Sequence, residues 1–184
     1  MKDLVAQMIP SPHGGLIHPK DPGEPGGKCF AKRWSVTQTD AAVLQALAKG
    51  RRVIEIGTGL GVSSASMAEV GASVVTIDID PWVAETVAPH LPDSVRFELG
   101  RDGVGDGERF DLAFIDGLHT PEAVQEDIAF VIGKLDLPAV IALHDAGDEN
   151  VQQGIEMAGF SPADVAYVPT KAGIALLFVG DRAQ

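Results

Sequence analysis

The 184-residue sequence is poor in cysteine and in basic side chains, and each scarcity excludes a class of protein. A single cysteine, Cys29, cannot form an internal disulfide, which excludes a disulfide-stapled scaffold and fits a reducing compartment. Only 14 lysines and arginines stand against 26 aspartates and glutamates, so the formal net charge is -12. The basic residues are scattered and form no patch that would neutralise nucleic-acid phosphates.

Long apolar runs are also missing. No stretch approaches the ~20 apolar residues of a membrane span, and residues 1–10 lack the apolar core of a signal peptide. We therefore expect a cytoplasmic protein with no membrane and no nucleic-acid partner. The length fits one domain over residues 1–184, and 45% hydrophobic residues are enough for a buried core.

Proline and glycine are concentrated in residues 9–27, IPSPHGGLIHPKDPGEPGG. Such a composition excludes a regular helix or a central strand. We expect residues 1–33 to form an N-terminal arm, either a disordered leader or a flap that orders over a ligand.

From residue 39 onward, short apolar runs alternate with helical segments. Strands are expected at residues 52–57, 73–78, 95–99, 110–116 and 139–145, helices at 40–49, 62–70, 81–90, 121–135 and 151–160, and a closing hairpin at 164–169 and 173–180. This alternation requires parallel crossovers and a sheet covered on both faces. The sequence predicts an α/β fold: a doubly wound, mostly parallel, seven-stranded sheet with a C-terminal antiparallel hairpin.

A glycine-rich turn follows the first expected strand, in the segment Glu55-Ile-Gly57-Thr58-Gly59-Leu-Gly61. Glycines allow a tight turn and a close approach of the backbone to a ligand. The dinucleotide fingerprint G-x-G-x-x-G would need glycine in place of Val62 or Ser64, which disfavours a dehydrogenase.

The second expected strand ends at Asp78, at the spacing from the turn at which a carboxylate accepts ribose hydroxyls. Asp80, just before Pro81, is expected to cap the next helix.

The turn resembles the first motif of the class I methyltransferases, and the resemblance covers the chain from Asp40 onward. It implies S-adenosylmethionine as cofactor, bound by the following residues: Glu55 at the amino-acid end, often through water; Gly57, Thr58, Gly59 and Gly61 under the methionine part; Asp78 at the ribose; Asp102 at the adenine amino group; and Asp116 near the sulfonium. A plain turn residue is an equally supported interpretation of Asp102.

The fourth expected strand is followed by Asp116-Gly-Leu-His119, within FDLAFIDGLHTPEAVQEDI. This segment is similar to small-molecule O-methyltransferases, including antibiotic-sugar enzymes, and lacks the Asn/Asp-Pro-Pro-Tyr motif of DNA-base N-methylation. The similarity implies methylation of a hydroxyl of a small molecule. Asp116 and His119 are the implied catalytic residues, with His119 as general base.

The fifth expected strand ends in His144-Asp145, next to the fourth strand in this fold. Asp116 and Asp145 would then lie ~5 Å apart and share a divalent cation such as Mg²⁺. Related metal-dependent enzymes carry an acid or an amide where this chain has His144, and imidazole suits Zn²⁺ or Fe better. Three interpretations stay open: His144 faces elsewhere, the metal differs, or no metal binds and Asp145 only caps a helix or lies in a loop.

Two alternative functions remain beside O-methylation: an N-methyltransferase, and a protein that binds S-adenosylmethionine without turnover. The acceptor pocket would come from the arm and the loops, where one sequence is least informative. The expected partner is a small-molecule hydroxyl acceptor, and a homodimer is compatible with all of these expectations.

Overall fold

The computed structural model describes residues 36–180. The predicted arm over residues 1–33 and Cys29 lie outside the described residues, as do residues 181–184.

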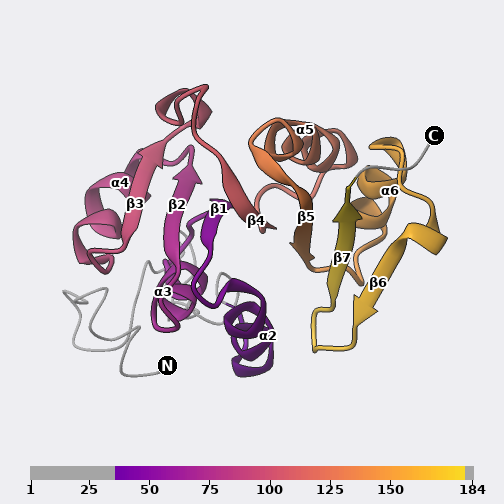
Figure 1. Cartoon of the computed structure of the whole chain (residues 1–184), viewed down its shortest axis with the longest axis horizontal. Coiled ribbons are helices and arrows are strands. Elements are labelled where there is room, and N and C mark those ends of the chain that lie inside the picture. The colour runs from indigo at the N-terminus through magenta and orange to yellow at the C-terminus, as the bar shows by residue number, and fades with distance from the viewer. Residues whose placement is uncertain (1–35, 181–184) are drawn as a thin grey trace, which may run out of the picture.

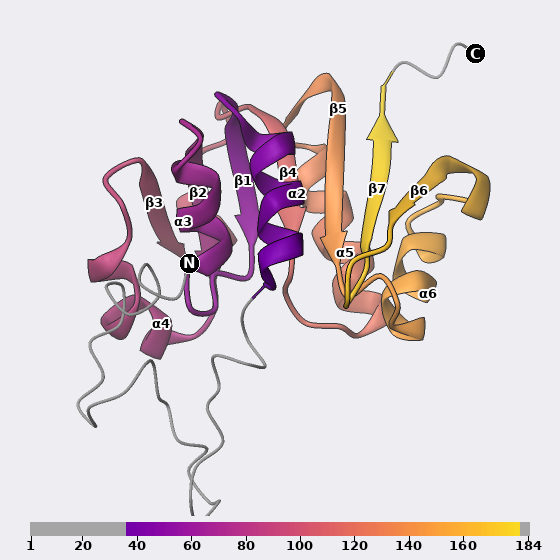
Figure 2. The same ribbon diagram turned by 90° about the horizontal axis from the view of Figure 1, so that it is seen from below.

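Seven strands form one sheet in the order β3-β2-β1-β4-β5-β7-β6 (Figures 1 and 2). The strands are β1 (Arg52–Ile56), β2 (Ser73–Asp78), β3 (Val95–Leu99), β4 (Phe110–Ile115), β5 (Leu135–His144), β6 (Val165–Val168) and β7 (Ile174–Val179). Pairing is parallel from β3 to β5, and β7 runs antiparallel to both β5 and β6. The predicted doubly wound sheet with its closing hairpin is confirmed.

Helices cover both faces of the sheet (Figure 2). On one face, α2 (Gln38–Ala48), α3 (Val62–Ala68) and α4 (Pro81–Thr86) pack over alternate strand residues such as Val53 and Val74. On the other, α5 (Pro121–Ile132) and α6 (Glu149–Met157) pack over the intervening ones, such as Ile54 and Val75. Burial of both faces explains why the strands are near-continuous apolar runs.

The order in which strands are added to the sheet reverses at β1, which pairs with β2 on one side and β4 on the other, both in parallel. Such a reversal opens a crevice beyond the carboxyl ends of the strands, where ligands bind in open α/β sheets. The turns after β1, β2, β4 and β5 all reach this edge.

Several helix ends differ from the sequence expectation, for reasons of capping. Helix α2 begins at Gln38, before Asp40, because Thr37 is the N-cap and accepts from the Asp40 amide in a capping box. Helix α6 begins at Glu149 because Asp148 caps it. Asp80 caps α4 as predicted, accepting from the Trp82 amide at 2.8 Å.

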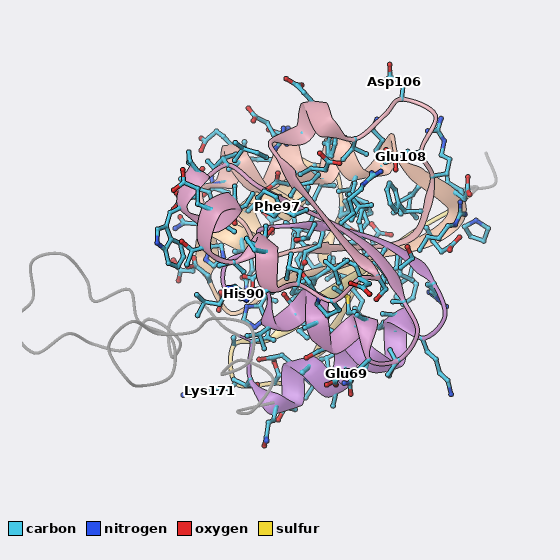
Figure 3. The ribbon with its side chains drawn as sticks, turned by 90° about the vertical axis from the view of Figure 1, so that its left-hand side faces the viewer. Glu69, His90, Phe97, Asp106, Glu108 and Lys171 are labelled. Carbon is cyan, nitrogen blue, oxygen red and sulfur yellow. The ribbon has the colours of Figure 1, made fainter. Side chains whose placement is uncertain are left out.

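Further boundaries were placed wrongly. Helix α4 ends at Thr86, and a separate 3-10 turn over Ala88–His90 follows, with His90 exposed at the surface (Figure 3). Strand β5 begins at Leu135, four residues earlier than expected, and α5 ends at Ile132. Among residues 36–180, no helix combines the length and the apolar character needed to cross a membrane.

Candidate functional site

A cavity of about 1100 Å³ opens at the carboxyl ends of β1, β2, β4 and β5. Among the predicted site residues, only Glu55 and Gly61 do not line this cavity. The predicted residues that line it are Gly57, Thr58, Gly59, Asp78, Asp102, Asp116, His119, His144 and Asp145. A pocket for one drug-sized ligand occupies ~300–1,000 Å³, so this cavity has room for a cofactor and a small acceptor together.

The glycine turn brings the ends of β1 and β4 into direct contact. Gly57 has φ +92°, and a Cβ there would lie 2.1 Å from the carbonyl oxygen of Asp116. Gly59 and Gly61 also have positive φ, at +50° and +72°, and Gly61 is the N-cap of α3. Only glycine meets both demands at position 57, a left-handed backbone and no side chain.

Asp78 holds the glycine turn from the end of β2. Its Oδ2 accepts from the amides of Thr58 at 3.1 Å and Gly59 at 3.0 Å, and its Oδ1 accepts from the Asp80 amide. A carboxylate has about four acceptor sites, so Asp78 keeps capacity for a ribose hydroxyl. Its predicted contact with a cofactor stays a prediction.

Glu55 is fully buried beneath the turn and accepts from the hydroxyls of Ser63 and Ser64. Burial raises the pKa of Glu55 to about 7, against the two serine hydrogen bonds, which lower it. Ser63 lines the cavity, whereas Glu55 does not. The structure therefore gives Glu55 a place behind the ligand-facing surface, supporting α3 and Ser63.

An ion pair that sequence reasoning missed closes one side of the cavity. Arg101, in the 3-10 turn after β3, pairs with Asp127 of α5, and both line the cavity beside Asp102. The Arg101 guanidinium also lies 5.3 Å from the centre of the Phe130 ring. Burial raises the pKa of Asp127, although Arg101 lowers it. The available signal was the charge of Asp127 on the apolar face of α5, between Val124 and Val131.

His144, at the end of β5, is enclosed by carboxylates. Its Nδ1 lies 3.3 Å from Asp116 Oδ1 and 3.2 Å from Asp145 Oδ2, and its side chain is 8% exposed. Burial works to lower the pKa of His144, but hydrogen bonding to Asp116 and Asp145 and their charges raise it to about 11. The interpretation that His144 faces elsewhere is therefore wrong, because its ring faces Asp116 and Asp145.

Asp116 and Asp145 meet across the β4–β5 pair as expected. Burial works to raise the pKa of Asp116, but His119 and His144 lower it to about 2. Asp145 adopts φ +51°, a left-handed conformation uncommon outside glycine, and this turns its carboxylate back toward Asp116 and His144. Asp116, His144 and Asp145 each offer a ligand atom within 4.8 Å of the others.

His119 stands beside this group with its Nε2 3.5 Å from Asp145 Oδ2 and 3.8 Å from Asp116 Oδ1. Its side chain is 33% exposed and lines the cavity. Asp116, followed by Asp145 and Asp148, raises the pKa of His119, although burial lowers it. An imidazole beside two carboxylates is stabilised once it has taken up a proton.

Asp40 is a further residue that sequence reasoning missed. It lies in the first turn of α2, is fully buried, and places Oδ2 3.3 Å from His144 Nε2. Burial works to raise its pKa, but hydrogen bonds from Thr170, Thr37 and His144 together lower it. No sequence signal joins Asp40 to His144, because only the packing of α2 on the sheet brings them together.

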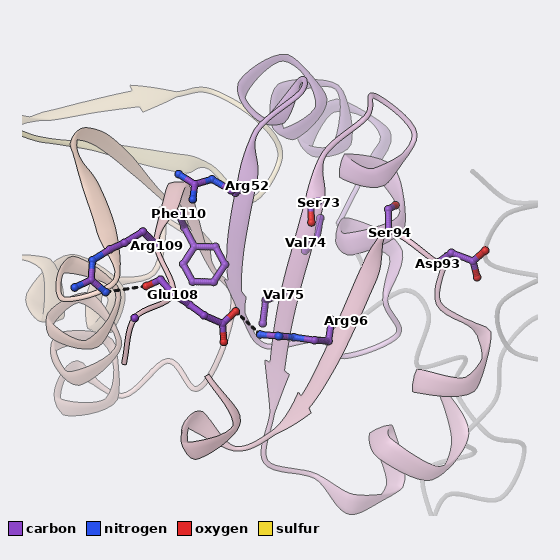
Figure 4. Close-up of a pocket in the computed structure, with 11 residues that line it drawn as sticks. Arg52, Ser73, Val74, Val75, Asp93, Ser94, Arg96, Glu108, Arg109 and Phe110 are labelled. Carbon is purple, nitrogen blue, oxygen red and sulfur yellow. Dashed lines mark hydrogen bonds and ion pairs between the residues drawn. The ribbon is translucent and has the colours of Figure 1, made fainter. Parts of the chain in front are cut away.

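A smaller hollow of about 400 Å³ lies at the opposite edge of the sheet (Figure 4). It is lined by the first residues of three strands, Arg52, Ser73 and Phe110, with Arg96 and Glu108 beside them. Of its arginines, Arg96 pairs with Glu108 at 2.6 Å and Arg52 with Asp111 at 3.0 Å, and Arg109 donates to two backbone carbonyl oxygens. Its lining includes no residue of the glycine turn and none of Asp116, His119, His144 and Asp145.

Comparison with known proteins gives a family match over half of the chain. Residues 54–146 match the protein family described as a methyltransferase domain. The match includes the glycine turn, Asp78, Asp116, His119 and the His144-Asp145 pair.

Solved structures share the fold. The cofactor-bound protein Rv0187 from MTB is 26% identical, with a TM-score of 0.66 over 80% of this chain and 82% of that one. The O-methyltransferase TomG from Streptomyces achromogenes, involved in tomaymycin synthesis and solved with SAM, is 24% identical, with a TM-score of 0.62 over 82% of this chain and 86% of that one.

Curated relatives match shorter segments. The ribosomal RNA small subunit methyltransferase A of Bifidobacterium adolescentis is 42% identical over 52 residues, which are 26% of this chain and 17% of that protein. The chain spans less than half the length of the curated relatives it matches.

Proposed function

The chain belongs to the methyltransferase-domain family, and we propose that it transfers the methyl group of S-adenosylmethionine to a hydroxyl of a small molecule. The observation that carries this proposal is the acid–histidine group of Asp116, His119 and Asp145 at the end of the cavity away from Asp78 and Asp102. In this proposal the cofactor binds at the Asp78 end of the cavity and the acceptor at the His119 end. TomG, an O-methyltransferase of the same fold, supports the choice of a hydroxyl.

The cofactor end is built from the backbone. The bare Cα atoms of Gly57 and Gly59 allow a ligand to lie close to the turn, and Asp78 offers its remaining acceptor capacity to the ribose. S-Adenosylmethionine supplies a methyl group that is already activated by its sulfonium. The protein therefore has mainly to align the two reactants and to remove the hydroxyl proton.

His119 is the proposed general base. A hydroxyl held between Asp116 and His119 gives its proton to His119 Nε2 while its oxygen bonds to the methyl carbon and the sulfur–carbon bond breaks. Asp116 and Asp145 stabilise the imidazolium that forms, and S-adenosylhomocysteine and a methyl ether leave. Because these carboxylates raise the pKa of His119, neutral base accumulates at a higher pH than for an ordinary histidine.

The donor set also fits a divalent cation. Three ligand atoms converge from Asp116, His144 and Asp145, and within residues 36–180 neither of the two carboxylates forms an ion pair with a lysine or an arginine. A cation there would lower the pKa of a bound hydroxyl. The base at His119 does not depend on it.

N-methylation remains the second candidate, since one solved relative of this fold is a 1,6-didemethyltoxoflavin-N1-methyltransferase from Burkholderia thailandensis. The observation favouring oxygen is the base at His119, because a neutral amine needs no base before it attacks.

Labelled S-adenosylmethionine should be incubated with the full chain and a panel of sugars, catechols, polyphenols and amines, with and without divalent metals. We expect label in a hydroxyl compound, and a 10²–10⁴-fold slower transfer in His119→Ala. The matched control is His90→Ala, which removes an exposed histidine outside the cavity and should leave the rate unchanged. Label only in amines, or normal turnover by His119→Ala, would overturn the proposal.

A further inference from the structure

Both nitrogens of His144 face carboxylates, two at Nδ1 and one at Nε2. On the cavity side, Nδ1 lies 3.3 Å from Asp116 Oδ1 and 3.2 Å from Asp145 Oδ2. On the protein side, Nε2 lies 3.3 Å from Asp40 Oδ2. The ring plane is set by an edge-to-face contact with Phe114, with centroids 6.3 Å apart at 72°.

Asp40 has no place in the proposed methyl transfer, yet it is a fully buried acid outside the cavity lining. Burying a carboxylate is costly unless it is paired and hydrogen-bonded. Thr37 supplies two of the hydrogen bonds, from its amide at 2.7 Å and its hydroxyl at 2.5 Å, both to Oδ2. The same oxygen faces His144 Nε2, which is buried and has no hydrogen-bond partner within residues 36–180, so Thr37 holds Asp40 close to that ring.

Two of the three separations on the other side of the ring match those around a small metal ion, and the third, between Asp116 and Asp145, is within 4.8 Å. Two ligands ~2.1 Å from a tetrahedral ion lie ~3.4 Å apart. Asp116 Oδ1 and Asp145 Oδ2 lie 3.3 and 3.2 Å from His144 Nδ1. Three protein ligands that leave a fourth position open are the arrangement of catalytic rather than structural ions.

We propose that Asp40 is a positioning residue that accepts the Nε2 proton of His144, so that Nδ1 serves with Asp116 and Asp145 as ligand to an imidazole-accepting divalent ion such as Zn²⁺ or Co²⁺. Histidine ligands commonly donate their second nitrogen to a carboxylate, which fixes the tautomer and raises ligand basicity. Mg²⁺ prefers oxygen donors, so the imidazole selects against it. The ion takes the place of a proton on Nδ1, which leaves to solvent.

This inference deepens the metal component of the proposed function and can be tested without turnover. Metal-free full-length protein would be titrated with Zn²⁺, Co²⁺ and Mg²⁺, using a competing chelator or calorimetry. We expect one Zn²⁺ per chain and Mg²⁺ bound at least ~100-fold more weakly. No binding of any ion, or Mg²⁺ bound as tightly as Zn²⁺, would overturn the inference.

Asp40→Asn should weaken Zn²⁺ binding by ~10–100-fold, the usual effect of losing a partner behind a metal-bound histidine. The matched control is Asp148→Asn, which removes a charge close enough to act on His119 while asparagine still caps α6. The control should change Zn²⁺ affinity by less than ~3-fold. Equal effects of the two variants would show that only general charge matters and would overturn the role of Asp40.

Asp40 also belongs to the capping box of α2, so His144→Asn provides a test that leaves this cap intact. It replaces the imidazole with an amide that offers oxygen, and the preference for Zn²⁺ over Mg²⁺ should fall at least ~10-fold. In the wild type, bound Co²⁺ should show visible absorption of a low-coordinate nitrogen–oxygen site, which the variant loses. An unchanged spectrum and preference would overturn His144 as ligand.

Binding of S-adenosylhomocysteine to metal-free protein separates this inference from the proposed function. Retained cofactor binding without metal binding would overturn the metal site alone, because within residues 36–180 no hydrogen bond joins the glycine turn or Asp78 to Asp40 or His144.

Discussion

At the scale of single residues, the site is governed by where negative charge is buried. Glu55 and Asp40 are fully buried, the side chain of Asp116 is 23% exposed at the cavity wall, and the surroundings of the three acids differ. Burial raises the pKa of Glu55, because the serine and threonine hydrogen bonds that lower it offset only part of that effect, whereas the histidines beside Asp116 lower the pKa of that acid against its burial. Neighbouring acids in one site thus have opposite protonation tendencies.

Glu55 makes folding depend on pH. Its pKa of about 7 in the folded protein exceeds the ordinary 4.5, so the folded state binds more protons and loses stability as pH rises from about 4.5 to 7. The loss amounts to about 3 kcal/mol when complete. Glu55→Gln removes this dependence on pH, because glutamine does not ionise. We expect the free energy of unfolding of the variant, relative to that of the wild type, to rise by up to about 3 kcal/mol between pH 5 and pH 8.

Urea unfolding of both proteins at pH 5 and pH 8 measures this gain. Glu156→Gln, at an exposed position of α6, is the matched control and should track the wild type. A stability difference between Glu55→Gln and the wild type that stays constant over this range would mean that Glu55 is ionised in the folded protein throughout.

At the scale of elements, the strands were predictable and the helix ends were not. Strands 73–78 and 95–99 were predicted residue for residue, because apolar runs between turns leave little choice of boundary. The start of α2 was placed at Asp40, since an acid commonly caps a helix. In the structure Thr37 is the cap and Asp40 is the third helical residue. That difference points Asp40 inward, and it is why its contact with His144 escaped the sequence.

The glycine turn is the element on which the site depends, and Gly57→Ala tests it. A Cβ at this position is strained by the φ of +92° and would lie 2.1 Å from the backbone of Asp116. We expect a loss of about 3–5 kcal/mol in the free energy of unfolding, or a failure to fold.

Gly71→Ala is a control that separates strain from contact. Gly71 also has a positive φ, +81°, but a Cβ there meets nothing within 4 Å. The free energy of unfolding of Gly71→Ala should fall only by the backbone strain, about 1–2 kcal/mol. Denaturant titration compares the two variants. Equal losses would mean that β1 and β4 can separate at little cost, contrary to the close approach seen here.

At the scale of the whole molecule, one edge of the sheet collects side chains that are far apart in the sequence. Asp78, Asp116 and His144 follow three different strands, and the parallel topology alone brings them to one cavity. Because strand order follows from the fold class, these residues could be predicted. The Arg101–Asp127 pair and Asp40 could not, since a helix and a turn must first pack on the sheet before those side chains meet.

The cavity links the stability of the whole chain to its cofactor. A ligand that binds only the folded state at 100 times its dissociation constant adds ~2.7 kcal/mol to the free energy of unfolding. For a chain of this length that corresponds to a rise in Tm of roughly 5–10 °C. We expect S-adenosylhomocysteine to produce this rise and NAD to produce none, because the glycine spacing does not fit a dinucleotide.

Asp78→Ala localises the effect to the predicted ribose contact. Loss of a charged hydrogen-bond acceptor should weaken binding by ~1.5–3 kcal/mol, and half or more of the Tm rise should disappear at the same ligand concentration. Asp106→Ala, at an exposed acid on the loop before β4 (Figure 3), should keep the full rise. A full rise in Asp78→Ala would show that the carboxylate serves only the turn, through the amides of Thr58 and Gly59. A rise with NAD alone would contradict the cofactor itself.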